Sequence, residues 1–399
     1  MDIKQIEDNY FMHTYKRINL VVKKAKNRFI WDRNGKKYLD FFAGISVCNV
    51  GHCNEAVIKA VKKQLDSFAH VSNLYYALPQ IKLGEELVKR IFPVSGRVFL
   101  SNSGAEANEC AIKIAKKWGF LNPSKKGNRY EIICFTNSFH GRTLTTLSAT
   151  GQEKFHEFFK PLCDGFVFAE INNIDSVKKL LNDRTVAVMI EPIQGEGGII
   201  PSDKVFLKDL RAFCDENNLL LIFDEIQCGV GRTGKFYAFE NYDVKPDIVT
   251  LAKSLANGLP LGATIAGEKC AEAFSYGEHG STFGGNPVSC AAALAVLKII
   301  NSKFLRTSSK TAEYLRVKLE DLKEKYSVIE CIRGLGLMIG ICLKVSGKDI
   351  VSYCMDRGLI INCTQETVLR LLPPLTITKK DVDFAVKILE EALKWKLTK

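Results

Sequence analysis

An acid and a lysine that each follow an apolar run could carry out chemistry together. The run 219–223 leads into Asp224, and the run that starts at Asp247 leads into Lys253. Such runs are typical of strands buried on both faces of a parallel sheet, and ligands bind at the carboxyl ends of these strands. Pyridoxal phosphate requires this pair, a lysine to form a Schiff base with its aldehyde and an acid to keep its ring nitrogen protonated. We therefore predict that Lys253 and Asp224 are catalytic residues.

A predicted helix start at Ser103 could bind the phosphate of such a cofactor. Ser103 and Glu106 have capping-box spacing, and Gly119 can end the helix. Free backbone N–H groups and a hydroxyl at the start, with Gly104 allowing close approach, would form a phosphate site. Taken alone, the pattern favours an ordinary well-capped helix. Together with the acid and the lysine, it favours phosphate binding.

Two further loops follow predicted strands and could form walls of a site. One contains Glu191, Glu196 and three glycines, a combination that is costly to bury without partners. The alternative interpretation of this segment is an ordinary flexible loop. The other contains Phe139, His140 and Arg142. An aromatic ring there could stack on a cofactor, and an arginine could bind a carboxylate through two hydrogen bonds. For His140 alone, a structural role is favoured over catalysis.

One motif indicates a different class of protein. Residues 229–235 fit the first seven positions of a nucleotide-binding P-loop, but Phe236 stands at the eighth, where magnesium coordination needs Ser or Thr. No helix-like pattern follows it directly. A P-loop nucleoside triphosphatase is therefore a disfavoured alternative, and a catalytically silent, basic RNA-binding α/β protein is another.

The composition is that of an ordinary soluble globular protein. The chain has 399 residues, of which 46% are hydrophobic and 25% charged, so two domains are expected. Its first residues lack the apolar core of a signal peptide, and no apolar run is long enough to span a bilayer. We therefore expect a cytoplasmic protein with no membrane partner.

Cysteine spacing and charge distribution argue against a metal site and against nucleic acid. The 13 cysteines are scattered through apolar segments and no pair has Cys-x-x-Cys spacing, so we expect reduced, mostly buried thiols and no metal. The net charge of +12 comes from dispersed lysine pairs and not from a stripe interleaved with aromatic residues. Solvated surface is the expected role of these lysines.

The order of strand-like and helix-like segments predicts two domains. Alternation of the two kinds predicts a large, doubly wound α/β domain over residues 50–288. The two ends, 1–49 and 289–399, predict a small, discontinuous α+β domain. Strands of the large domain are expected at 97–100, 131–135, 186–190, 219–223, 247–252 and 263–267. Helices of the ends are expected at 288–300, at 308–326 and from Thr378, and strands at 29–32, 37–40, 328–330, 337–341 and 359–361.

Six segments in family order over nearly the whole chain are similar to the class III aminotransferases. They are residues 102–109, 139–142, 191–196 and 224–227, Lys253, and residues 282–287. The resemblance implies fold type I, the aspartate aminotransferase-like architecture of pyridoxal-phosphate enzymes, with a large α/β and a small α+β domain. Residues 54–55 are Asn-Glu where relatives usually have His-Pro, and residues 254–258 contain less glycine than usual.

The resemblance implies a role for each candidate residue that binds the cofactor. Lys253 would bind the aldehyde, Asp224 would pair with the pyridine nitrogen, and Gln227 would contact the ring hydroxyl. Phe139 would stack on the ring, and His140 and Glu191 would belong to the same set. Ser103, Gly104 and Ala105 would hold the phosphate, helped by Thr282 from the partner subunit of a homodimer.

The resemblance also implies how two substrates share one pocket. Arg142, with Tyr15 nearby, would bind the far carboxylate, and Arg370 would bind the α-carboxylate of glutamate or 2-oxoglutarate. Glu196 would neutralise Arg370 when no carboxylate faces it. For Arg370, a structural salt bridge is the alternative.

Residues 14–17 and 73–76 are most similar to the family members that act on acetylornithine in arginine biosynthesis. The implied reaction transfers the terminal amino group of N2-acetylornithine to 2-oxoglutarate, and it gives N-acetylglutamate semialdehyde and glutamate. Ornithine, succinylornithine, succinyldiaminopimelate, acetyl-lysine and 4-aminobutyrate stay open as amino donors, because one sequence does not reveal the shape of the pocket.

Overall fold

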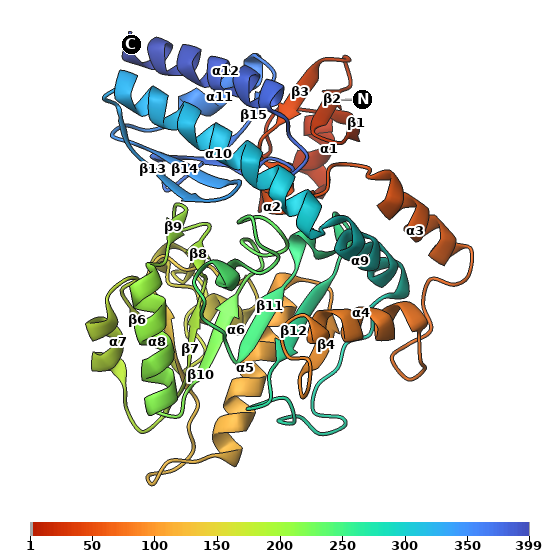
Figure 1. The fold of residues 1–399 in the computed structure, drawn as a ribbon, viewed down its shortest axis with the longest axis vertical. Helices are drawn as coiled ribbons and strands as arrows, with labels where there is room; N and C mark the ends of the chain where they lie inside the picture. The colour runs from red at the N-terminus through yellow and green to blue at the C-terminus, as the bar shows by residue number, and fades with distance from the viewer. Residues whose placement is uncertain (1–2, 399) are drawn as a thin grey trace.

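A seven-stranded sheet forms the centre of the larger part of the molecule. The computed structural model describes residues 3–398 (Figure 1). Five neighbouring strands of this sheet are parallel, and β12 runs antiparallel to both of its neighbours. In order across the sheet the strands are β4 (Arg97–Ser101), β12 (Gly262–Ala266), β11 (Ile248–Leu251), β10 (Leu220–Asp224), β7 (Thr185–Ile190), β5 (Glu131–Phe135) and β6 (Phe166–Ala169).

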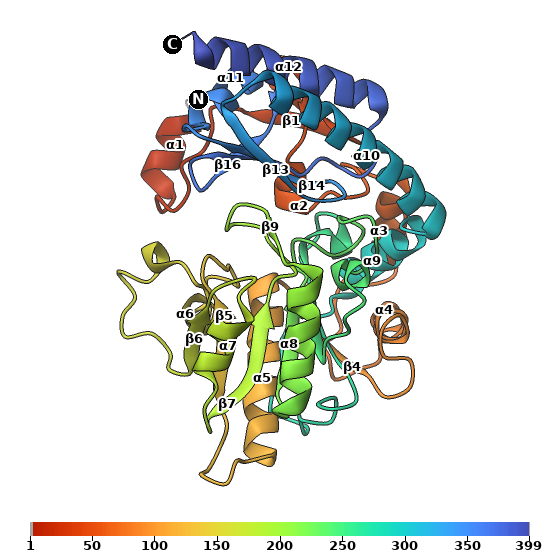
Figure 2. The same cartoon turned by 60° about the vertical axis from the view of Figure 1, so that its left-hand side comes forward.

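Alternate residues of the central strands pack into two different cores. In β10, Leu221 and Phe223 pack with helix α8 (Lys204–Glu216), whereas Leu220 and Ile222 pack with helix α5 (Gly104–Leu121). The two helices therefore cover opposite faces of the sheet (Figure 2). Continuous apolar runs are expected where both faces of a strand are covered. The six strands predicted for this region are confirmed to within two residues at each end, and the fold is the expected doubly wound α/β type.

Other helices complete the larger part. Helices α3, α4 and α9 pack together at one side of the sheet, and α7 packs on β6. Their bounds are α3 (Glu55–Leu65), α4 (Leu78–Lys89), α6 (Leu144–Ser148), α7 (Ile174–Leu180) and α9 (Pro287–Ile299), with a short ribbon of β8 (Ile193–Gln194) and β9 (Ile200–Pro201). The short helical turns are η1 (Glu153–Phe155), η2 (Ala238–Asn241) and η3 (Lys253–Ala256).

The two ends of the chain form a second layered unit with its own core, above the large sheet in Figure 1. Its sheets have the orders β13-β14-β17-β16 and β1-β2-β3-β15, and the parallel pair of β3 with β15 joins the amino-terminal segment to the carboxyl-terminal one. The strands are β1 (Val22–Lys26), β2 (Phe29–Asp32), β3 (Lys37–Asp40), β13 (Ile329–Leu335), β14 (Met338–Leu343), β15 (Leu359–Ile360), β16 (Asn362–Thr364) and β17 (Val368–Leu371). The helices are α2 (Ala43–Ser46), α10 (Ser302–Lys325), α11 (Lys348–Asp356) and α12 (Lys379–Leu397). We propose that the division between the two domains lies at residues 49/50 and 288/289; α9 begins at the second division, but its buried residues, such as Cys290 and Val296, pack in the core of the larger part.

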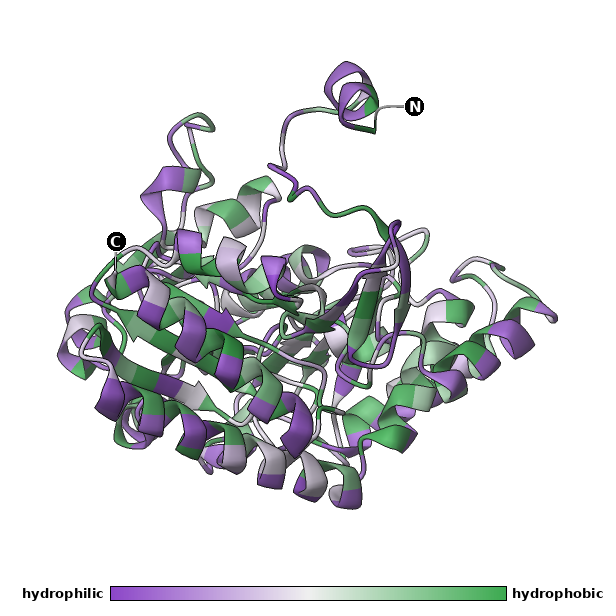
Figure 3. Cartoon of the chain, turned by 90° about the horizontal axis from the view of Figure 1, so that it is seen from above, coloured by the Kyte–Doolittle hydropathy of each residue, from purple (hydrophilic) through white to green (hydrophobic). Residues whose placement is uncertain are grey.

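Helix α1 (Ile3–Tyr10) has no buried residue and stands away from the rest of the chain (Figure 3). Among residues 3–398, no single helix is long and apolar enough to cross a bilayer. The pair α9 and α10 passes that test only when the two are joined across a 71° bend.

Three local predictions are wrong. Helix α5 continues through Gly119 to Leu121, and Gly119 is needed there because a Cβ would lie 2.1 Å from the carbonyl oxygen of Arg129. The helix predicted at 308–326 begins at Ser302, where the side chain of Asn301 caps it. The capping box of α5 is only half formed: the Ser103 hydroxyl accepts the N–H of Glu106, but the Glu106 carboxylate binds Asn102 and not the N–H of Ser103.

Candidate active site

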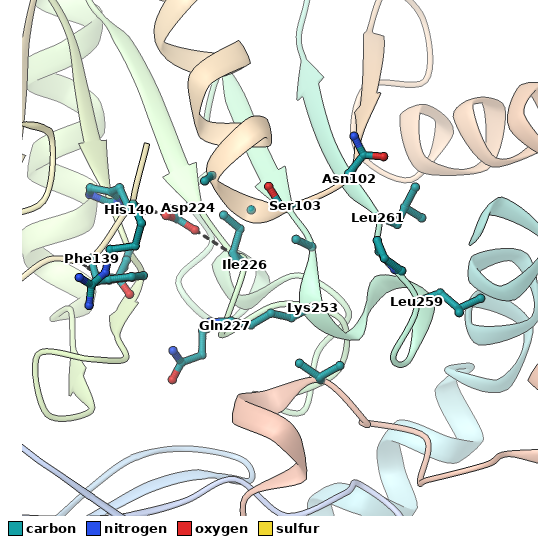
Figure 4. A pocket seen from close by; sticks show the side chains of 18 of the residues that line it. Asn102, Ser103, Phe139, His140, Asp224, Ile226, Gln227, Lys253, Leu259 and Leu261 are labelled. Atoms are coloured by element: carbon teal, nitrogen blue, oxygen red, sulfur yellow. Dashed lines mark hydrogen bonds and ion pairs between the residues drawn. The ribbon is translucent and has the colours of Figure 1, made fainter. Parts of the chain in front are cut away.

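A cavity of about 450 Å³ opens at the carboxyl ends of β10 and β11 (Figure 4). The register of the two strands explains why two distant side chains meet there. Asp224 pairs with Thr250, so Lys253 lies three residues further along, just past the end of β11. Ten of the predicted site residues line this one cavity: Ser103, Gly104, Ala105, Phe139, His140, Arg142, Glu191, Asp224, Gln227 and Lys253.

Asp224 is held by three hydrogen-bond donors at the bottom of the cavity. The residue is 3% exposed, and Oδ2 accepts hydrogen bonds from Nδ1 of His140 and Nδ2 of Asn108, both at 2.8 Å. Oδ1 accepts the backbone N–H of Ile226 at 3.0 Å. Burial, together with the nearby charge of Asp224, raises the pKa of Glu191 to about 7. Asp224 is therefore the carboxylate of this cavity that is best supplied with hydrogen-bond donors.

Lys253 sits at the start of η3 in an unusual backbone conformation. Its φ of 45° lies in the left-handed region, which costs a side chain other than glycine roughly 1–2 kcal/mol. Burial lowers the pKa of Lys253, and the charge of Arg370 adds to this effect while Glu196 opposes it. Strained backbone of this kind is typical of functional positions. A lysine with a lowered pKa supplies a neutral amine nearer to neutral pH than an exposed lysine does.

The start of α5 forms a cradle that a larger residue would fill. Ser103 caps the helix, and its hydroxyl faces the same cavity as Asp224. A Cβ on Gly104 would lie 2.8 Å from Cδ1 of Ile226, so a larger residue there would require the Ile226 side chain to shift. The helix dipole and the free N–H groups at this end favour an anion.

Arg370, which is buried, forms an ion pair with the partly buried Glu196 beside the cavity. Nη1 of Arg370 lies 2.6 Å from Oε1 of Glu196 and 3.2 Å from Oε1 of Gln227, a residue that lines the cavity. Nε of Arg370 donates to Asn362 at 3.0 Å, and the residue is 1% exposed. Burial alone would raise the pKa of Glu196, but the charge and hydrogen bond of Arg370 lower it, so the carboxylate is ionised.

Arg142 lies at the cavity without a carboxylate partner in the described part of the chain. Its guanidinium stacks over the ring of Phe155 at 4.0 Å and lies 5.6 Å from the centre of the Phe139 ring. Stacking fixes the plane of the guanidinium and leaves its N–H groups free. Arg142 can therefore accept a carboxylate from solution, in contrast to Arg370, which already has one.

Besides Arg370 and Glu196, which lie next to the cavity, two predicted residues do not line it and lie away from it in the single chain. Tyr15 is 75% exposed, contacts Arg17, and does not line the cavity with Arg142. Thr282 lies in a loop that Asn73 holds through hydrogen bonds to the carbonyl oxygens of Ser281 and Gly284. That loop borders a different, small cavity.

The P-loop-like segment does not form a phosphate loop. The side chain of Arg232 is fully buried, and it donates to the carbonyl oxygens of Leu337 and Pro373 and to the hydroxyl of Ser46. No α-helix begins directly after the segment, because the next helical element is the short turn η2. The segment therefore joins the large sheet's loops to the carboxyl-terminal part of the chain.

Three site residues were not singled out from the sequence. Asn108 donates a hydrogen bond to Asp224, and Thr250 donates one to Asn108. The ring of Phe155 stacks against the guanidinium of Arg142. Asn108 alone gave a signal, because it is a polar residue on the otherwise apolar face of α5 that includes Ala107 and Ala111. Thr250 looks like any strand threonine, and nothing in the sequence pairs Phe155 with an arginine.

Comparisons with known proteins agree with this geometry. The family model for class-III aminotransferases matches residues 10–393. The acetylornithine aminotransferase of Methanocaldococcus jannaschii is 50% identical over 97% of this chain and 96% of its own, and that of Aquifex aeolicus is 44% identical over 96% and 100%. An ornithine aminotransferase structure from Toxoplasma gondii superimposes with a TM-score of 0.93 at 30% identity, covering 99% of this chain and 95% of that one. The structure of the N-acetylornithine aminotransferase from Stenotrophomonas maltophilia superimposes with a TM-score of 0.84 at 35% identity, covering 99% of this chain and 99% of that one.

The chain therefore belongs to the class-III aminotransferase family. It is a pyridoxal-phosphate-dependent enzyme of fold type I, as the sequence motifs imply.

Proposed function

We propose that this enzyme transfers the terminal amino group of N2-acetyl-L-ornithine to 2-oxoglutarate, giving N-acetyl-L-glutamate 5-semialdehyde and L-glutamate, as a step of arginine biosynthesis. The observation that carries the proposal is the presence of two unlike arginines beside Lys253. Arg142 stacks on Phe155 and has no carboxylate partner among residues 3–398, whereas Arg370 is paired with Glu196. Relatives that bear the acetylornithine name are 40–50% identical over at least 95% of the chain.

The residues present fit pyridoxal phosphate. We assign the aldehyde to Lys253, the ring nitrogen to Asp224, the ring hydroxyl to Gln227 and the stacked face to Phe139. Ser103, Gly104 and Ala105 hold the phosphate at the start of α5, where a side chain at position 104 would collide with Ile226. We assign His140 and Glu191 to the same site, where His140 bonds to Asp224 and Glu191 accepts the backbone N–H groups of Phe139 and Gly195. When bound, the cofactor supplies an aldehyde that captures the substrate amine and a protonated ring that accepts electrons.

Lys253 moves the proton. With the substrate amine held by the cofactor, Nζ of Lys253 would be a free amine that removes the proton from the carbon bearing that amine and returns it to the cofactor carbon. Burial and Arg370 lower its pKa, which leaves more of the amine unprotonated near neutral pH. Because the aldehyde product would leave before the oxo acid enters, while the amino group stays on the enzyme, the kinetics are expected to be ping-pong.

The two arginines divide the carboxylates between them. Arg142, stacked on Phe155, binds the carboxylate far from the reacting carbon, and we assign Tyr15 to the same carboxylate. Arg370 binds the α-carboxylate of glutamate or 2-oxoglutarate. In the other half-reaction no substrate carboxylate faces Arg370. Glu196 then balances the charge of the buried Arg370 guanidinium, since an unpaired buried charge is costly.

Replacement of Glu196 by alanine tests this exchange. Without the competing carboxylate, the ratio of the glutamate half-reaction rate to the ω-amine half-reaction rate is expected to rise about tenfold, because a hydrogen bond to a charged group contributes about 1.5–3 kcal/mol. Stopped-flow absorbance measures each half-reaction separately. Glu196→Gln, which keeps a hydrogen bond to Arg370 without the charge, should lie between wild type and alanine. An unchanged ratio in Glu196→Ala would show that Glu196 is not the switch.

We further propose a cytoplasmic homodimer whose active sites are shared across the interface, with no membrane or nucleic-acid partner. Large apolar side chains lie exposed near Thr282, among them Leu74 at 87%, Tyr76 at 95% and Phe283 at 61%. Exposed apolar groups that gather in one region favour a protein interface. A second copy seated there would bring Thr282 to the phosphate site of its partner.

Steady-state assays with a panel of amino donors test the substrate. N2-acetylornithine is expected to give the highest kcat/KM with 2-oxoglutarate as acceptor, above ornithine, succinylornithine, succinyldiaminopimelate, acetyl-lysine and 4-aminobutyrate. A strong preference for unacetylated ornithine would overturn the named substrate and leave the aminotransferase class intact.

A further inference from the structure

A chain of fully buried hydrogen bonds reaches Asp224 from the side away from the cavity. The hydroxyl of Thr250 donates to Oδ1 of Asn108 at 2.8 Å. Nδ2 of Asn108 donates to Oδ2 of Asp224 at 2.8 Å and to the carbonyl oxygen of His140 at 2.7 Å. Thr250 and Asn108 are both completely buried. The reaction as described above uses neither of them.

The orientation of the Asn108 amide is fixed by its partners. The carbonyl oxygen of His140 can only accept a hydrogen bond, so the atom that faces it must be the amide nitrogen. Both hydrogens of that nitrogen are then used, and the amide oxygen takes the Thr250 hydroxyl. The reversed orientation would turn the amide oxygen toward a carboxylate and a carbonyl at once. Thr250 and the His140 carbonyl therefore lock Asn108 with its donor toward Asp224.

The same bonds decide which oxygen of Asp224 is available. Oδ2 already accepts two hydrogen bonds, from Asn108 and His140. Among residues 3–398, Oδ1 accepts only the backbone N–H of Ile226, which lies beside Asp224 in Figure 4. A carboxylate oxygen can accept two hydrogen bonds. The unused acceptor position is therefore on Oδ1.

All three donors to Asp224 lie on the protein side of the cavity. Nδ1 of His140 lies 2.8 Å from Oδ2, so its proton points to the carboxylate, and Nε2 is buried with no partner among the described residues. Hydrogen bonds from an imidazole, an amide and a backbone N–H favour the charged form of the carboxylate. That charge is left to attract a cationic N–H in the cavity.

We propose that Asn108, locked by Thr250, is a positioning residue that holds Oδ2 of Asp224 so that Oδ1 meets the ring nitrogen of the cofactor. The inference rests on the proposed function, because it takes Asp224 as the partner of that nitrogen. It assigns a role to two residues that do not touch the cofactor.

The chain contains a matched control for Thr250. Thr264 is its directly paired residue on β12, is also buried, and also donates to α5, but to the backbone oxygen of Ala107 at 2.7 Å. Thr250→Val and Thr264→Val therefore each remove one buried hydroxyl bonded to the same helix. Only the first removes a bond that leads to Asp224.

The first measurement is the Kd of pyridoxal phosphate for the apoprotein, by quenching of protein fluorescence. Thr250→Val is expected to raise it about three- to tenfold, which is the effect of one neutral hydrogen bond, and Thr264→Val by less than about twofold. Asn108→Leu, which also removes the donor to the carboxylate, is expected to raise it about ten- to a hundredfold. Equal effects of the two threonine variants would overturn the proposal.

The second measurement is the pH titration of the visible absorbance of the loaded protein, which a merely structural role would leave unmoved. The midpoint of this titration is expected to rise in Thr250→Val and to stay at the wild-type value in Thr264→Val. A cofactor ring that is less firmly protonated carries less positive charge, so it repels the proton of the nearby group that gives the visible band less. An unchanged midpoint in Thr250→Val and Asn108→Leu contradicts the inference alone. A wild-type protein that develops no visible band with the cofactor contradicts the proposed function as well.

Discussion

Replacement of Lys253 by alanine is expected to reduce transamination by at least about a thousandfold, because it removes both the covalent attachment of the cofactor and the group that moves the proton. Acid–base catalysis alone contributes about 10²–10⁴-fold. The loss should appear in kcat of both half-reactions, since each needs the same proton transfer. Steady-state rates and single-turnover absorbance changes measure it.

Lys269→Ala is the matched control for that variant. Lys269 is also partly buried, and its ammonium donates to the carbonyl oxygen of Leu219, at the opposite end of the strand that leads to Asp224. Its loss should leave the rate within about twofold, because it removes one hydrogen bond far from the cavity. Turnover of Lys253→Ala at the wild-type rate would remove the basis of the mechanism.

Asp224→Asn is expected to give the second-largest loss, about 10²–10³-fold in kcat, which is typical when one preorganised electrostatic group is removed from an active site. The substitution keeps the shape of the side chain but takes away the charge that holds the ring nitrogen protonated. The amide would also place an NH₂ group against either the N–H of Ile226 or the two donors at Oδ2. Weaker cofactor binding should accompany the lower rate.

Asp247→Asn distinguishes the loss of the Asp224 charge from the loss of any buried carboxylate. Asp247 accepts the backbone N–H of Leu221 at 2.8 Å and pairs with Arg211 at the other end of β10 and β11. Its replacement should lower stability, seen as a lower Tm, without a comparable loss of rate. Equal losses of rate in the two variants would mean that Asp224 acts through folding and not through the ring nitrogen.

The sequence was sufficient to predict the central sheet and the meeting of Asp224 with Lys253. Strands buried on both faces require unbroken apolar runs, and parallel neighbours place their carboxyl ends at one edge. The end of β10 and the end of β11 could therefore be located from the runs alone. The reversed direction of β12 left no such mark, since a strand buried on both faces reads the same in either direction.

The sequence was insufficient where a role depends on a contact between distant residues. Asn108 meets Asp224 across 116 positions and Thr250 across 142, and no local pattern encodes either distance. The capping-box spacing at Ser103 was present, but Asn102 offered Glu106 two donors and displaced the expected bond. Tyr15 and Thr282 lie away from the cavity of their own chain, so their roles stay proposals that depend on a partner subunit and on the amino-terminal segment.

The most direct test of the central claim is to locate the cofactor on the chain. Borohydride reduction of the protein loaded with pyridoxal phosphate, followed by proteolysis and mass spectrometry, should find the added mass on the peptide that contains Lys253 and on no other lysine. A label on a different lysine, or no label on a protein that still transaminates, would contradict the account.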